Sequence, residues 1–302
     1  MFQATSGKLT MAAQRKYYNE GTERKLQAVQ SYLERFLTAL SKQNFKTMYV
    51  DAFAGSGTNE TNFVPPRMSL HPEEIDVLEV KLGSALRALN LEKKFSKYVF
   101  IEKSKGKIEE LKLHVEKTGN ADRVTYLQGD TNEELMKICS EISKSNVRAV
   151  VFLDPFGNQV GWDLLEALAK TRHVDLWYLF PSMLGVYRQI GNINAKMTPE
   201  QEASLDKIFG PNDWRSAFIE KQTFNGLFGP TETEVKIADV AQISRFMITS
   251  LGKIFQGGVC DSWLPLGRDG AHWYSLLFAM ANPSNKAQSI GHGIAKHIMT
   301  HK

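Results

Sequence analysis

The chain has 302 residues, of which 42% are hydrophobic and 23% charged, the composition of an ordinary soluble globular protein. Its two cysteines, Cys139 and Cys260, are too few for a disulfide scaffold or a multi-cysteine metal site, and its scattered histidines predict no bound metal. No apolar run approaches the roughly 18 residues of a membrane span, and the first residues lack the pattern of a signal peptide. We therefore expect a cytoplasmic protein without membrane attachment.

Basic residues are concentrated at the start of the chain. The formal net charge is +4, whereas residues 1–46 alone carry eight Lys and Arg against three Glu. Such an excess predicts contact with the phosphates of DNA or RNA, although a solvated helix surface accounts for it equally well. These residues are Lys8, Arg15, Lys16, Arg24, Lys25, Arg35, Lys42 and Lys46.

Helices and strands are predicted to alternate through residue 180. An irregular lead of about 20 residues precedes a helix that Thr22 caps and that runs to Ser41, because apolar residues recur there at helical spacing. Strands are expected to end at Asp51, Glu102, Gln128, Leu153 and Phe180. The helices between them are expected at residues 84–91, 104–117, from a capping-box sequence at 131–134, and at 161–172.

The regular alternation stops after the fifth strand. Residues 183–230 contain many glycines and prolines between short helical stretches, which predicts a mobile helical insertion that caps the functional edge of the sheet. A helix at 233–251, a hairpin at 258–281 and a last helix from Ser284 follow. The predicted organisation is a core at 1–182, a cap at 183–232 and a completion of the core at 233–302.

The order of elements predicts the fold. Alternating strands and helices form a parallel sheet with helices on both faces, and the strand at 147–153 is apolar enough to be central. Five such strands plus a closing hairpin give a seven-stranded, mostly parallel sheet. This is the Rossmann-like architecture of class I S-adenosylmethionine-dependent methyltransferases, an α/β fold.

Acidic residues follow the predicted strands at one edge of the sheet. Asp51 opens onto a turn with two glycines, Gly55 and Gly57, and Glu102, Asp130 and Asp154 occupy the same place after later strands. Open α/β sheets bind ligands at this carboxyl edge. Four acids at the ends of consecutive strands predict a ligand rich in hydrogen-bond donors, such as a cofactor with an ammonium, a ribose diol and an adenine amine.

Other cofactors and chemistries match the sequence less well. A dinucleotide fingerprint requires a third glycine where Glu60 stands, and there is no P-loop motif. Residues 79–81 have a nuclease-like Glu-x-Lys pattern, but under the methyltransferase arrangement they are the loop before a helix. Neither cysteine follows a proline, so a cysteine-nucleophile mechanism has little support.

Residues 51–57, Asp-Ala-Phe-Ala-Gly-Ser-Gly, resemble motif I of nucleic-acid methyltransferases. Over residues 22–281 the chain is more closely similar to the three-Cys-motif partner proteins, a bacterial group expected to be methyltransferases. The features that carry this resemblance are Lys25-Leu26 with Tyr32-Leu33, the motif above, and residues 83–89, 100–102, 152–157 and 177–181.

The resemblance implies a role for each strand end. The turn from Phe53 to Gly57 would hold the methionine part of S-adenosylmethionine, with Asp51 reaching its ammonium through water. Glu102 would accept hydrogen bonds from the ribose hydroxyls, and Asp130 one from the adenine amine.

The sequence from Asp154 through Pro155 and Phe156 occupies the place of motif IV, where the methyl acceptor lies. Amine methyltransferases have Asp-Pro-Pro-Tyr here, so this chain lacks one proline and its aromatic residue comes one position early. Phe156 is expected either to stack on a planar substrate or to be a buried hinge residue.

Two functions follow from this reading. The first is a methyltransferase that acts on nucleic acid in a bacterial modification or defence context. The second is a methyltransferase-fold protein that works without turnover, as the partner of a protein encoded alongside it.

Overall fold

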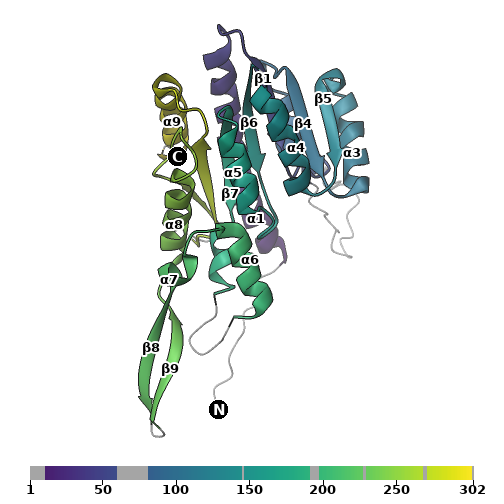
Figure 1. The fold of residues 1–302 in the computed structure, drawn as a ribbon. Helices are drawn as coiled ribbons and strands as arrows, with labels where there is room; N and C mark the ends of the chain where they lie inside the picture. Colours follow the sequence, from purple (N-terminus) through teal and green to yellow (C-terminus); the bar gives the residue numbers. More distant parts are fainter. Residues whose placement is uncertain are drawn as a thin grey trace, which may run out of the picture.

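The computed structural model describes residues 11–59, 81–144, 146–190, 197–226, 229–267 and 271–300 (Figure 1). Residues 60–80, between the glycine turn and the helix expected at 84–91, lie outside the described part of the chain. The helix α1, Met11–Leu40, is one 30-residue element, about 45 Å long at 1.5 Å per residue. Thr22 therefore lies inside a helix and does not cap one, so the predicted helix start was wrong.

The main sheet has seven strands in the order β10-β11-β7-β6-β1-β4-β5. All neighbours are parallel except β11, which is antiparallel to both β7 and β10. This arrangement confirms the predicted Rossmann-like methyltransferase fold, because the last strand is inserted in reverse beside the fifth parallel one. The strands are β1 Lys46–Asp51, β4 Lys97–Glu102, β5 Val124–Gln128, β6 Val147–Leu153, β7 Val174–Phe180, β10 Leu264–Leu266 and β11 Tyr274–Met280.

Helices cover both faces of this sheet (Figure 1). One buried cluster joins the sheet to α1, α2, α3 and α9, and the other joins it to α4, α5, α6, α7 and α8. Neighbouring strand residues such as Tyr49 and Val50 face opposite clusters, as the pleat requires. The bounds are α2 Ser84–Leu89, α3 Lys105–Glu116, α4 Thr131–Lys144, α5 Trp162–Lys170, α6 Pro199–Phe209, α7 Trp214–Phe218, α8 Val240–Gly252 and α9 Asn285–Thr300.

The segment after the fifth parallel strand is partly helical, as predicted, but it also contains a ribbon. The strands β8, Ile219–Gly226, and β9, Gly229–Lys236, pair antiparallel and extend away from the body (Figure 1). The helix predicted from Thr233 therefore begins only at Val240, since Asp239 caps α8 by accepting a hydrogen bond from the Gln242 N–H. Thr and Glu alternate in β9, but an alternation of polar residues alone does not predict a strand.

The same segment also contributes to the core. It begins with the π-helix Ser182–Tyr187, and Phe209 and Phe218 of α6 and α7 are buried in the cluster that contains the sheet. Their rings stand edge to face with centroids 5.5 Å apart. Removing residues 183–230 would therefore open the core, which makes such a deletion a poor test of the predicted cap.

Two short strands, β2 Thr58–Asn59 and β3 Lys81–Leu82, close the region around the glycine turn. They bring Gly83 beside Gly57, whose carbonyl accepts a 2.7 Å hydrogen bond from the Gly83 N–H. The start of α2 is thus fixed against the end of β1. None of the described helices combines the length and hydrophobicity that a bilayer-spanning segment requires.

Candidate functional site: a two-part cleft at the carboxyl edge

A cleft lies where the strand order reverses, between β1 and its two neighbours β4 and β6. It consists of a cavity of about 250 Å³ and a smaller one of about 100 Å³, and both are lined by Phe53, Gly55 and Asp154. The larger cavity extends to Glu102 and Asp130, and the smaller one to Gly57. Seven of the nine residues predicted for the site, Phe156 among them, thus line one cleft at the topological switch point.

The glycine turn is shaped by backbone geometry that a side chain would disturb. Gly55 and Gly57 have φ angles of +60° and +84°. A Cβ on Gly57 would lie 2.7 Å from Leu111 Cδ1 and 3.2 Å from Leu86 Cγ, whereas a Cβ on Gly55 would meet nothing within 4 Å. Gly57 therefore packs against α2 and α3, while Gly55 leaves open space facing the cleft.

Glu102 holds the two loops of the larger cavity together. Its Oε2 accepts a 3.1 Å hydrogen bond from the Gly55 N–H, and its Oε1 accepts one of 2.8 Å from the Ser104 N–H. A carboxylate has about four acceptor sites, so two remain for a ligand. Glu102 is thus positioned to accept hydrogen bonds from a diol in the cavity.

Asp130 is at once the cap of a helix and part of the cavity wall. Its Oδ1 accepts hydrogen bonds from the Asn132 N–H at 2.9 Å and from Asn132 Nδ2 at 3.0 Å, which lowers the pKa of the carboxyl. Asp130, rather than the predicted Thr131, therefore caps α4, while the Thr131 hydroxyl donates to the Ala52 carbonyl. Within the described residues, Oδ2 of Asp130 accepts no hydrogen bond and is available to an amine.

Asn132 links the two sides of the larger cavity, a role that no sequence pattern indicated. Besides contacting Asp130, its Nδ2 donates to the Gln159 carbonyl at 2.9 Å, and its Oδ1 accepts from the Gly161 N–H at 2.8 Å. The loop after β6 is therefore fastened to the start of α4.

Asp51 lies beneath the cleft and lines neither cavity. It is fully buried, accepts a 3.3 Å hydrogen bond from the Phe53 N–H, and has a pKa raised to about 6, chiefly by burial. The charge of Asp154 also raises this pKa, whereas the Ser84 hydroxyl and Lys25 lower it. Asp51 thus supports the turn, and its predicted water-mediated contact with an ammonium stays a prediction.

The acid of the motif IV segment is paired with a lysine from the first helix. Lys25 Nζ lies 2.5 Å from Asp154 Oδ2, and the two side chains are 11% and 23% exposed. Because both are largely withdrawn from solvent, their attraction is screened by salt less than that of a surface ion pair. Lys25 therefore belongs to the cleft, and the prediction that it faces solvent as part of a basic surface was wrong.

The inward orientation of Lys25 follows from the spacing of residues along one face of α1. Thr22 and Lys25 precede Leu26 and Val29, which are 5% and 2% exposed, at the i, i+3, i+4, i+7 spacing of one helix face. Both polar residues line the smaller cavity. Because the predicted helix from Thr22 to Ser41 already contains these four positions, the spacing alone could have identified Lys25 as inward-facing.

The loop after β6 presents an aromatic side chain beside the cleft. Phe156 is 88% exposed, and its N–H donates to Gln159 Oε1 at 2.8 Å, so it is not the buried hinge residue considered above. Pro155 is buried. Next to them, Asn158 Nδ2 donates to the Gly185 carbonyl and to Ser204 Oγ, which ties this loop to the segment after β7.

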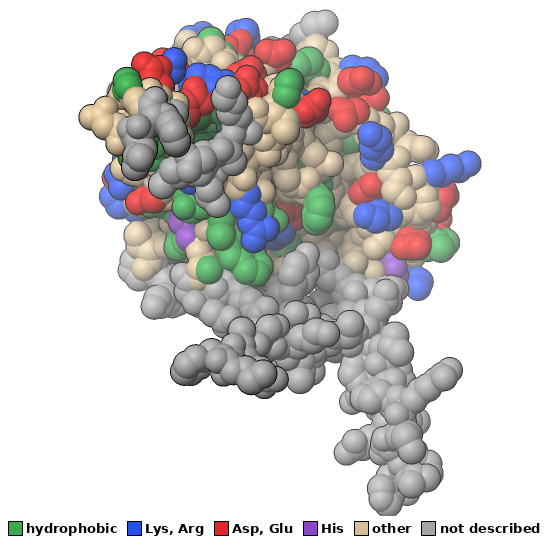
Figure 2. Space-filling view, turned by 90° about the horizontal axis from the view of Figure 1, so that it is seen from below, with side chains coloured by type: hydrophobic (Ala, Val, Ile, Leu, Met, Phe, Trp, Pro, Cys, Tyr) green, Lys and Arg blue, Asp and Glu red, His purple; other side chains and the backbone are tan. Residues whose placement is uncertain are grey.

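The basic residues of the N-terminal region do not gather at the cleft. Lys8 and the side chains of Arg15 and Lys16 lie outside the described residues. Arg35, Lys42 and Lys46 are exposed near the other end of α1, away from Lys25. Figure 2, which shows the lower face of Figure 1, has Lys and Arg side chains interspersed with Asp and Glu. Lysines 103 and 107 do line the larger cavity.

The hydrogen-bond acceptors of the cleft suit S-adenosylmethionine, which carries hydroxyl and amine donors, better than a nucleotide phosphate. The carboxylates of Glu102 and Asp130 line the larger cavity and can accept hydrogen bonds from hydroxyl and amine groups, and Gly55 leaves room for close approach. Both cysteines are buried, and burial raises the pKa of Cys139 to about 12, which does not suit a nucleophile. Among the described residues, no three metal-ligating side chains gather.

Neither the protein-family models nor the curated proteins compared with the chain give a match. Solved structures are distantly similar. A Legionella pneumophila protein has 13% identity, covering 78% of this chain and 92% of that one, with a TM-score of 0.40. An S-adenosylmethionine-dependent methyltransferase from Clostridium acetobutylicum has 11% identity, coverage of 83% and 91%, and a TM-score of 0.35.

An RNA methyltransferase from Salinibacter ruber, in complex with S-adenosyl-L-homocysteine, has 16% identity, coverage of 68% and 90%, and a TM-score of 0.27. Scores this low assign no activity. The fold class rests on the strand order of the sheet itself, which places this chain among proteins with the Rossmann-like methyltransferase fold.

Proposed function

We propose that this chain binds S-adenosylmethionine and transfers its methyl group to a nucleic acid. One observation carries the proposal: the two adjoining cavities have ribose- and adenine-type acceptors, Glu102 and Asp130, at one end and the motif IV acid, Asp154, at their junction. An acceptor at Asp154 would therefore adjoin the methionine end of the cofactor. Bound there, the cofactor supplies an electrophilic methyl group.

The chain's own residues bind and orient the two reactants. The Phe53–Gly57 turn and Lys25 surround the smaller cavity, where an amino acid moiety would lie. Asp154 would hold a donor group of the acceptor once Lys25 no longer occupies its Oδ2. Phe156 offers an exposed ring on which a base can stack, worth about 1–3 kcal/mol for a base on an aromatic side chain.

The segment after β7 supports the acceptor side. Asn158 joins the loop that carries Phe156 to Gly185 and Ser204, so this segment fixes the place of the ring. This agrees with its proposed role as a cap, although its buried residues make it part of the core.

A transfer assay with labelled S-adenosylmethionine and mixed DNA or RNA tests the activity. We expect incorporation with the native chain, loss in Asp154→Asn, and at least a tenfold reduction in Phe156→Ala. Phe224→Ala on the ribbon removes a ring that is 49% exposed and is the matched control, which should retain full activity. Equal losses in both phenylalanine variants would remove Phe156 from the acceptor site.

A second function is favoured by the ion pair at the acceptor site. In the structure, Lys25 pairs with Asp154, the acid that would otherwise hold the methyl acceptor. If the chain works only as an interaction partner, as its likeness to three-Cys-motif partner proteins suggested, this ion pair would remain closed permanently. Cofactor binding without transfer to DNA, RNA or protein from the same cell would favour that role. Lys25→Met should then leave the chain inactive as well.

Nucleic-acid binding itself is tested by its salt dependence, since phosphate contacts release counterions. Arg24 is exposed and Lys25 is not, so neutralising Arg24 should flatten the slope of log affinity against log salt by about 0.9 for a duplex contact. Neutralising Lys25 should leave the slope unchanged. A slope that responds to neither residue, or no binding at low salt, would place the acceptor among proteins or small molecules.

A further inference from the structure

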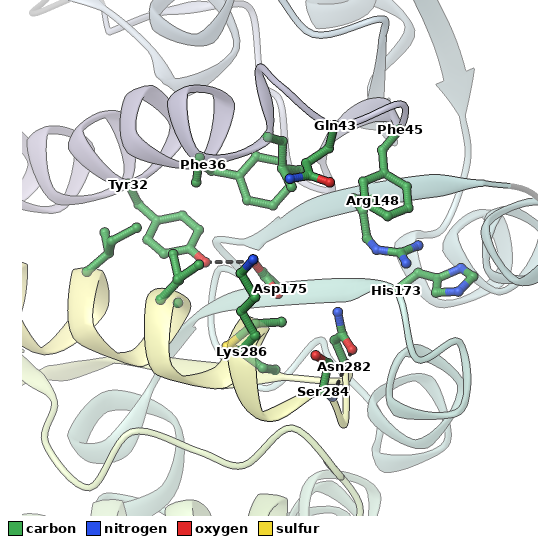
Figure 3. A pocket seen from close by; sticks show the side chains of 17 residues that line it. Tyr32, Phe36, Gln43, Phe45, Arg148, His173, Asp175, Asn282, Ser284 and Lys286 are labelled. Atoms are coloured by element: carbon green, nitrogen blue, oxygen red, sulfur yellow. Dashed lines mark hydrogen bonds between the residues drawn. The ribbon is translucent and has the colours of Figure 1, made fainter.

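A cavity of about 420 Å³ lies at the amino edge of the sheet, at the opposite end of the strands from the cleft (Figure 3). It opens between α1 and α9, and Arg148 and Asp175, near the starts of β6 and β7, form its inner wall. Its size is typical of small-molecule sites. The proposed methyl transfer makes no use of it.

One part of the cavity is apolar. Four apolar side chains line it: Phe36 of α1, Met280 of β11, and Ile290 and Ile294 of α9. Gly291 allows α9 to lie close to β11, because a Cβ there would lie 2.4 Å from Met280 Sδ. Ile290 is 43% exposed, so this wall reaches the surface and leaves an entrance.

The other part carries two cations, Arg148 and Lys286, and Asp175 attracts Arg148 without forming a close ion pair with it. The Arg148 guanidinium lies 4.0 Å from the centre of the Phe45 ring, and its Nη1 donates to the Val147 carbonyl at 2.8 Å. In the described part of the chain, no ion pair joins Arg148 or Lys286 to an acid. Burial lowers the pKa of Arg148, and its other N–H groups keep their capacity to donate. Lys286 lies in the first turn of α9, whose N-terminus adds positive potential.

The one acid of this wall is already engaged. Asp175 is 7% exposed and accepts a 2.6 Å hydrogen bond from the Tyr32 hydroxyl, drawn as a dashed line in Figure 3. Two cations therefore face one shielded carboxyl group. The excess of positive charge favours binding of an anion. The nearby Asp175 carboxyl group disfavours an anion that carries two negative charges.

We propose that this cavity binds a small carboxylate with an apolar tail, its head group on Arg148 and its tail between α1 and α9. Arginine suits this role because its planar fork pairs with both oxygens of a carboxylate, and stacking on Phe45 holds the fork in place. The site is independent of the cofactor cleft, so the inference does not depend on the methyltransferase proposal.

Calorimetric titration with octanoate, 1-octanol and octylammonium tests the head group, because the three probes share one tail. We expect saturable binding of octanoate at one site per chain. Octanol and octylammonium should bind at least about tenfold more weakly, because each loses the charged hydrogen bond to Arg148. Arg148→Met should weaken octanoate binding by a similar factor. Arg245→Met is the matched control, since Arg245 also lies over an aromatic ring, Trp263, outside this cavity.

Ile290→Trp fills the entrance from an exposed position and should abolish octanoate binding while the thermal midpoint of unfolding stays near that of the native chain. Circular dichroism of each variant confirms folding before titration. Absence of saturable octanoate binding, equal affinity for octanol, equal effects of the two arginine variants, or displacement of octanoate by S-adenosylmethionine would each overturn the proposal.

Discussion

Replacing Gly57 with alanine should destabilise the fold far more than the same change at Gly55. Both residues have positive φ, so each alanine carries the cost of that conformation, about 1–2 kcal/mol. At Gly57 the new Cβ also lies 2.7 Å from Leu111 Cδ1 and 3.2 Å from Leu86 Cγ, which adds overpacking of about 1–3 kcal/mol. Reduced entropy of the unfolded chain returns about 0.4–1 kcal/mol in both variants.

The expected loss of unfolding free energy is therefore about 1–5 kcal/mol for Gly57→Ala and about 0–2 kcal/mol for Gly55→Ala. Urea unfolding followed by circular dichroism measures both at one temperature, and the difference between the variants isolates the contact with α2 and α3. The affinities should behave in the opposite way. Gly55→Ala places a methyl group in the open space of the cleft, so it should bind S-adenosylmethionine at least tenfold more weakly although it is stable.

Equal destabilisation by the two changes would refute the packing derived for Gly57. Undiminished cofactor affinity in Gly55→Ala would show that the open space beside Gly55 is not the binding site.

Two further predictions concern buried charges. In a double-mutant cycle, Lys25→Met and Asp154→Asn should show a coupling of about 1–3 kcal/mol in urea unfolding, and a coupling under about 0.5 kcal/mol would mean the pair is not formed in solution. Burial raises the pKa of Asp175 from 3.8 to about 7, so its protonated form stabilises the fold below about pH 4, and this contribution is lost as the pH rises to 7. The stability of the native chain relative to Asp175→Asn should therefore fall between pH 4 and 7.5, and a pH-independent difference would contradict the buried environment.

The parallel sheet could be predicted because its strands have strong local patterns. The apolar run of β6 and the acids Asp51, Glu102 and Asp154 just after or at strand ends are short-range features, and the strand order then follows from the handedness of the connections. The ribbon β8–β9 was missed because its strands are mostly polar and their few apolar residues do not alternate regularly.

The residues that complete the cleft depend on long-range packing. Lys25 and Asp154 are 129 positions apart, so no local pattern shows that they pair. Asn132 contacts the Gln159 carbonyl because the start of α4 lies beside the loop after β6. That contact depends on how the two segments pack, which no local pattern shows. Asp51 ends β1 as predicted, but the turn that follows covers it. A pattern at a strand end therefore does not reveal whether an acid faces the ligand or supports the turn.

Calorimetric titration of the native chain with S-adenosylmethionine tests the central claim most directly, with NADH as the competing cofactor and Glu102→Gln as the variant. We expect one site per chain for S-adenosylmethionine, no comparable binding of NADH, and a loss of about 1–3 kcal/mol in Glu102→Gln, because two ribose hydroxyls lose their charged acceptor. Tighter binding of NADH, no binding of S-adenosylmethionine, or unchanged affinity in Glu102→Gln would contradict the assignment of this cleft.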